Sequence, residues 1–102
     1  MRMLKNKTAP ITEKEIIKIC RNVFDEVTIR ILINEFEDTL LISAVMKLRK
    51  LERIIVVLNV VIDMTPSEIA FILGTNTNSV YVQKQTALKK LKEFYLQEKE
   101  AV

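Results

Sequence analysis

Residues 65–92 constrain the fold most strongly, because they contain two helix starts on either side of the only glycine in the chain. The segment Thr65-Pro66-Ser67-Glu68 places a hydroxyl before a helix, a proline at its first position and a carboxylate at its third, which is a capping box. Gly74 follows where a helix needs a residue that tolerates positive φ. Asn76 or Thr77 can then cap a longer second helix. Two capped helices joined by a tight turn with glycine predict a helix-turn-helix.

The second helix is predicted from apolar residues that recur at helical spacing. They are Val80, Ala87, Leu88, Leu91 and Phe94. The same arrangement of helices and turn occurs in helical domains that bind no DNA, so the charge of the segment is needed to distinguish the two cases. Between residues 65 and 92 the only acid is Glu68, against four lysines, and lysines along a helix can neutralise phosphates. The pattern favours nucleic-acid binding, with an ordinary solvated face as the alternative.

The distribution of charge along the chain agrees with this interpretation. The net charge is only +3, but residues 11–46 carry four cations and seven acids, whereas residues 47–92 carry eight cations and three acids. The positive charge therefore coincides with the predicted helix-turn-helix.

Composition argues against an enzyme, a metalloprotein or a membrane protein. The chain has no histidine, one cysteine and one glycine, which removes the commonest general base and metal ligand and the glycine-rich phosphate loops. Cys20 lies among apolar residues at helical spacing and is expected to be a core residue. No apolar run approaches the ~20 residues that span a bilayer. We expect no catalytic residues, no metal, no cofactor, and a soluble protein of a reducing cytoplasm.

The rest of the sequence predicts an all-α domain of about five helices, because apolar residues make up 49% and glycine and proline are rare. Residues 1–10 are expected to form a basic disordered arm and residues 11–42 an N-terminal helical segment that offers a face to a partner or a second copy. Residues 43–102 are expected to form the helix-turn-helix domain.

Four further helices are expected before the helix-turn-helix. The first starts at a capping box at Thr12 and ends near Asp25, and the others cover about 26–36, 40–48 and 49–62. Residues 27–33 alternate like a strand, but no other segment could pair with them, so a helix is preferred.

The aliphatic content of residues 27–62 exceeds what one small helix-turn-helix needs for its core. One interpretation is a well-filled core of four or five helices. The alternative is a surface in residues 27–62 that packs on a partner protein or forms a homodimer.

Residues 43–94 resemble region four of the sigma-70 family of bacterial transcription initiation factors. The matching pieces are Ala44–Leu48, Leu51-Glu52-Arg53 with aliphatic residues after it, Thr65 with Glu68-Ile69-Ala70, Leu73-Gly74, Val80, and Ala87-Leu88-Lys89-Lys90-Leu91. The order and spacing of these pieces are those of the family. Part of the pattern is shared with LuxR-type response regulators.

The resemblance implies a domain that binds double-stranded promoter DNA at the −35 element and docks on the β flap of RNA polymerase. It places the recognition helix near Thr77, with the helix that starts at Thr65 lying across the DNA backbone. The DNA-binding residues it implies are Thr65, Thr77, Asn78, Ser79, Tyr81, Val82, Lys84, Gln85 and Lys89. Chemically, Asn78 can pair with adenine, Tyr81 can meet a thymine methyl or a phosphate, and the lysines can meet phosphates.

Two departures from the family pattern bear on function. Family members place arginines at the start of the recognition helix, and this chain has none there, which predicts weak, altered or AT-directed readout. Arg49 stands where the family usually has proline, so the helix at 40–48 could run into the next one. Residues 1–42 lack an aromatic-basic helix for melting DNA, which predicts a stand-alone regulator or half of a split factor.

The sequence is therefore compatible with three functions. The first is a sigma-region-four-like transcription regulator that binds promoter DNA. The second is a co-regulator that docks on RNA polymerase or a sigma factor without sequence-specific DNA binding. The third is a LuxR-like homodimeric regulator.

Overall fold

The computed structural model describes residues 12–101 of the chain. In this range the protein consists of α1 (Glu13–Glu35), α2 (Thr39–Met46), α3 (Lys50–Val56), η1 (Val57–Val61), α4 (Pro66–Leu73) and α5 (Thr77–Ala101). The described residues form no strand, so the prediction of an all-α fold with about five helices is confirmed. The arm predicted at residues 1–10 lies outside the described residues.

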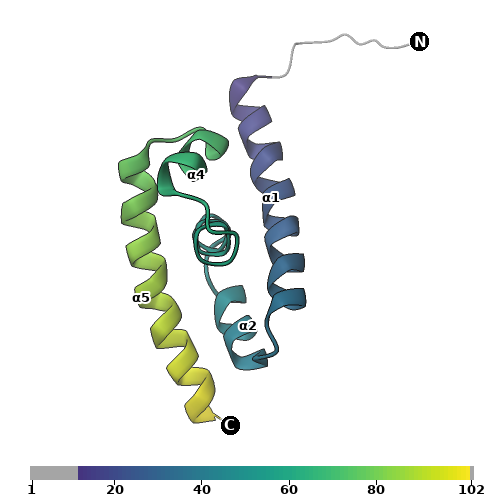
Figure 1. The fold of residues 1–102 in the computed structure, drawn as a ribbon, viewed down its shortest axis with the longest axis vertical. Helices are drawn as coiled ribbons and strands as arrows, with labels where there is room; N and C mark the ends of the chain where they lie inside the picture. The colour runs from purple at the N-terminus through teal and green to yellow at the C-terminus, as the bar shows by residue number, and fades with distance from the viewer. Residues whose placement is uncertain (1–11, 102) are drawn as a thin grey trace, which may run out of the picture.

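The two long helices, α1 and α5, flank the molecule, and α3 passes between them (Figure 1). α2 lies beside the C-terminal half of α5, while α4 lies near its N-terminal end (Figure 1). α3 contacts both flanking helices and thus forms the centre of the domain.

α1 is one continuous helix, so the predicted break near Asp25 is wrong. No glycine or proline interrupts residues 13–35, and the β-branched Thr28 is accommodated because its hydroxyl donates to the carbonyl of Asp25 at 2.9 Å. Asp25, Thr28 and Leu32 recur every three or four residues and are all buried. Helical burial on one face therefore overrides the local strand-like alternation, and the preference for helix over 27–33 is confirmed.

Arg53 of α3 binds α1 and the backbone at the end of α2. Its guanidinium binds both carboxylate oxygens of Asp25, with Nε–Oδ1 at 2.8 Å and Nη2–Oδ2 at 2.9 Å. Its third nitrogen, Nη1, donates to the carbonyls of Leu48 (3.1 Å) and Met46 (3.3 Å) at the end of α2. Because α2 ends there, the expectation that it runs past Arg49 into the next helix is wrong.

The helix that begins at Lys50 widens into the π-helical turn η1 before it stops. The amide of Ile62 donates to the carbonyl of Val57 at 3.2 Å, five residues back. Asp63 then adopts a positive φ of 66°, and the side-chain amide of Asn59 donates to the carbonyl of Met64 at 2.9 Å. These contacts close the helix end and turn the chain into α4.

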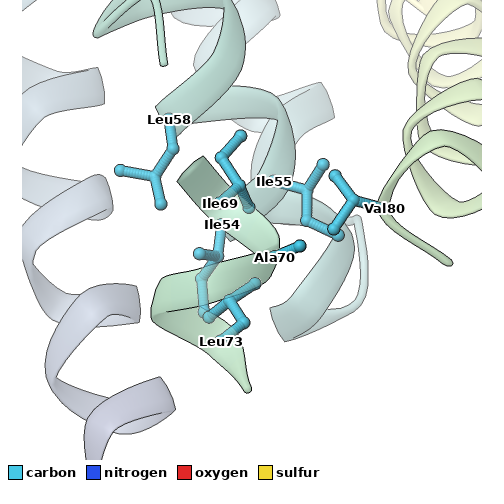
Figure 2. Packing of buried hydrophobic residues seen from close by; sticks show 7 residues of the cluster. All are labelled: Ile54, Ile55, Leu58, Ile69, Ala70, Leu73 and Val80. Atoms are coloured by element: carbon cyan, nitrogen blue, oxygen red, sulfur yellow. The ribbon is translucent and has the colours of Figure 1, made fainter. Parts of the chain in front are cut away.

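The buried apolar side chains of residues 12–101 form two clusters. The first joins α3 and η1 to α4 and α5, and Figure 2 shows its seven buried members converging from these elements. They are Ile54, Ile55, Leu58, Ile69, Ala70, Leu73 and Val80. The second joins α1, α2 and α5 through residues that include Leu32, Val45 and Ala87. Most of the aliphatic side chains of residues 27–62 are thus in the protein's own core.

Candidate nucleic-acid interface

The start of α4 is fixed by a complete capping box. The Thr65 hydroxyl accepts from the amide of Glu68 at 3.2 Å, and the amide of Thr65 donates to the Glu68 carboxylate at 2.9 Å. This hydrogen bond from Thr65 lowers the pKa of Glu68. A carboxylate of the protein itself therefore binds the N-cap amide at the start of α4.

The turn between α4 and α5 depends on Gly74. This residue has φ 68° and ψ 35°, and the amide of Thr75 donates to the carbonyl of Ala70 at 2.9 Å. A Cβ added at Gly74 would lie 3.1 Å from Cδ1 of Ile17 on α1. The turn is therefore tight both in its backbone and in its packing.

Asn76, one of the two residues expected to cap α5, accepts from the amide of Ser79 through its side-chain oxygen at 2.8 Å. Val80 and Ala87 are 0% exposed and lie seven residues apart on the inner face of α5. Their burial against the first and second clusters sets the rotation of α5 about its axis. The opposite face of the helix consequently points to solvent.

Five of the predicted DNA-binding residues lie on this solvent face. Asn78, Val82, Gln85 and Lys89 are exposed and follow one another at intervals of three or four residues, which places them in one row. Tyr81 is displaced to one side of these four residues and is 49% exposed. Together they form what we call the outer row of α5, and such a row on a helix can enter the major groove.

The other predicted residues of α5 lie elsewhere. Thr77, Ser79 and Lys84 are half-buried. The Ser79 hydroxyl accepts from Nε2 of Gln83 at 3.0 Å, and the Thr77 hydroxyl lies 3.5 Å from that of Ser67 on α4. The structure therefore places these three residues at the sides of α5 that adjoin its neighbours, apart from the outer row.

The predicted DNA-binding residues did not include two exposed residues of α5, Thr86 and Lys92, although Lys92 is one of the four lysines between residues 65 and 92. Lys92 continues the outer row, three residues after Lys89, and the same spacing in the sequence would have found it. Lys90 differs from its neighbours because its ammonium binds the Glu52 carboxylate at 3.0 Å. The buried Glu52 also accepts from the amide of Arg49 at 3.2 Å, so this pair links α3 to α5.

No group of three or more histidine, cysteine, aspartate or glutamate side chains in residues 12–101 could hold a metal ion. In the same range, no helix combines the length and apolar character needed to cross a membrane.

Comparison with known proteins identifies the domain. No curated protein and no solved structure matches the chain. A family described as sigma-70, region 4, matches residues 38–91, more than half of the chain, and covers α2 to most of α5. Its members are DNA-binding regulatory domains of the helix-turn-helix type that interact with DNA and RNA polymerase. The capped α4, the glycine turn and the outer row of α5 agree with this match, and the chain belongs to the sigma-70 region 4 family.

Proposed function

We propose that the protein is a transcription regulator that binds promoter DNA by inserting the outer row of α5 into the major groove. The observation that carries this proposal is the row itself, where Asn78, Gln85 and Lys89 are exposed at one helical face. Asn78 and Gln85 can each bond adenine through a side-chain amide, and Lys89 can neutralise a phosphate.

The absence of arginine from the first turns of α5 shapes the expected specificity. Arginine is the usual reader of guanine, whereas asparagine and glutamine pair with adenine and the exposed Val82 can contact a thymine methyl. We therefore propose that the protein prefers AT-rich duplexes.

The test is fluorescence anisotropy with AT-rich and random duplexes over a range of salt. Lys89→Ala should weaken binding to both duplexes and lower the salt slope by about 0.9. Asn78→Ala should weaken the preferred duplex by about 1–3 kcal/mol and leave the random duplex nearly unchanged. Lys99→Ala, near the far end of α5, is the matched control and should change neither. Equal losses on both duplexes with Asn78→Ala would refute base readout.

We also propose that the protein docks on the β flap of RNA polymerase. A cavity of about 150 Å³ is lined only by apolar side chains of α1, α2, α3, η1 and α5. Val60 and Leu88 at this cavity are 56% and 38% exposed, so a partner can reach them. An apolar helix of a partner could bury these side chains and would gain roughly 25 cal/mol per Å² of apolar surface.

Copurification with polymerase tests this contact. Val60→Glu should abolish capture of polymerase and leave DNA binding intact, while Phe71→Glu, at an apolar position on α4 that is more exposed (88%), should not affect capture. Capture without any DNA binding at low salt would select the alternative, a co-regulator that docks on polymerase or a sigma factor.

A homodimer remains the third proposal. Apolar side chains in residues 27–62 that are not in the core would provide the contact. They are Val27, Ile33, Met46, Val60 and Ile62. A mass measurement on the sample used for DNA binding distinguishes this case, because a LuxR-like regulator would be a dimer on a palindromic site.

A further inference from the structure

Four of the six side chains that line a groove between α1 and the start of α3 are cationic. The groove has a volume of about 490 Å³. Its lining consists of Lys14, Ile17, Lys18, Arg21, Asn22 and Lys50. We call it the basic groove. α1 lies outside the residues matched by the family, so this groove is an addition to the family's domain.

The helical spacing of α1 directs three cations into the groove. Lys14, Lys18 and Arg21 are separated by four and three residues and share one helical face. Asp25 continues the same face, but its carboxylate accepts hydrogen bonds from Nε and Nη2 of Arg53. The Asp25 carboxylate is therefore already paired with Arg53 and does not serve the groove.

The fourth cation comes from α3. Lys50 reaches across the groove and donates to the side-chain oxygen of Asn22. The groove residues include no carboxylate, so four like charges converge without an anion. Among residues 12–101, Nε of Arg21 is the one buried side-chain polar atom without a hydrogen-bond partner. Both features indicate that the groove is completed by an anion with acceptor oxygens.

The basic groove lies close to the helix-turn-helix. Ile17, in its lining, packs against Gly74 in the turn between α4 and α5. On the other side of the α3 start, a second hollow is lined by Arg49 and Glu52 together with Gln83 and Thr86 of α5. Polar and cationic groups thus continue from one flank of α5, across Arg49 and Lys50, to α1.

We propose that the basic groove binds the sugar–phosphate backbone of the duplex read by α5, beyond the base pairs that α5 contacts. The proposal rests on the proposed DNA-binding function. Lys14 and Arg21 are seven residues apart, roughly 10 Å along the helix axis. This length matches about three phosphates of one strand, since each phosphate advances about 3.4 Å along the duplex axis. Long lysine side chains can follow such a repeating array of charges.

Matched charge removal tests the proposal. Lys14→Gln with Lys18→Gln removes two exposed cations of the groove, and Arg30→Gln with Lys99→Gln removes two exposed cations elsewhere. Binding to a duplex of about 20 bp, roughly two helical turns, is measured by anisotropy as a function of salt. The groove variant should lower the salt slope by about 1.8, since each lost phosphate contact contributes about 0.9. The control should leave the slope unchanged, and circular dichroism should show both variants folded.

The outcomes separate this proposal from the proposed function. If Lys89→Ala weakens binding while the groove variant keeps the wild-type slope, the groove proposal is wrong and the role of α5 stands. If the groove variant loses slope but changes in the outer row have no effect, the groove contact stands and readout by α5 is wrong. If the groove variant keeps the wild-type salt slope but captures less polymerase, the assignment to DNA is wrong and the groove binds an acidic protein surface.

Discussion

Breaking the ion pair between Asp25 and Arg53 should lower the free energy of unfolding more than the removal of any exposed charge in the domain. Both side chains are nearly buried, at 12% and 11% exposure, and the pair is bidentate at 2.8 and 2.9 Å. In Arg53→Met, the Asp25 carboxylate would remain buried without its cation, and the carbonyls of Met46 and Leu48 would lose their donor. Removal of one partner of a buried pair costs about 3–5 kcal/mol.

That loss is large relative to the stability of the whole domain. A domain of this size has a free energy of unfolding of about 5–15 kcal/mol. With a urea m-value of about 2 kcal/mol/M, Arg53→Met should lower the urea midpoint by about 1.5–2.5 M. Asp25→Ala should cost less, about 2–3 kcal/mol, because Arg53 would keep its two carbonyl partners and some access to water.

The assay is urea unfolding followed by circular dichroism for wild type, the two single variants and the double variant. The double variant should be more stable than the sum of the single losses predicts, with a coupling energy of about 1.5–3 kcal/mol. Lys47→Gln, which breaks the more exposed pair of Lys47 with Glu98, is the control and should cost about 0–1 kcal/mol. Additive losses, or an Arg53→Met loss no larger than that of the control, would refute the reasoning.

Two further predictions concern the helix-turn-helix. Gly74→Ala should lower the free energy of unfolding by about 1–2 kcal/mol, because alanine is strained at φ 68° and its Cβ would press on Ile17. Gly74→Asn should lose less stability in the same urea assay, because asparagine tolerates this backbone conformation. An equal loss in both variants would mean that the contact with Ile17, and not the backbone strain, causes the destabilisation. Because the hydrogen bond from Thr65 lowers the pKa of Glu68 below its ordinary 4.5, the capping box should contribute stability above that pH and lose it as pH falls through the lowered pKa of the folded protein. Urea midpoints measured across this range should fall less steeply with acid in Glu68→Gln than in wild type, and parallel curves would contradict the assignment.

The helix-turn-helix was predictable because its signals are local. The Thr65 capping box, the positive φ of Gly74 and the cap at Asn76 each depend on residues within one turn of a helix, and the structure contains all three. Residues of the outer row were also found in advance, since Asn78, Val82, Gln85 and Lys89 follow helical spacing. The half-buried position of Lys84 was not predicted, because the candidate residues followed the family's pattern and not the helical phase set by Val80 and Ala87.

The length of α1 and the partners of its charges could not be predicted in the same way. The strand-like alternation of residues 27–33 is as local as a capping box, but burial of Thr28 and Leu32 against other elements decides the outcome. Likewise, nothing in the sequence shows that Arg53 takes Asp25, 28 residues away. The same pairing makes the Asp25 carboxylate unavailable to Arg21, which lies four residues earlier on the same face of α1.

The sequence by itself thus determined the all-α class, the two helices and turn that carry the outer row, and membership of a DNA-binding family. These follow from short-range hydrogen bonds, backbone preferences and the period of apolar residues, all of which act within a few residues. Only the tertiary structure decided how α1 packs on α3, which cations are neutralised and which converge in the basic groove. Those features depend on contacts between residues distant in the chain, and their energies exist only once the helices are packed together.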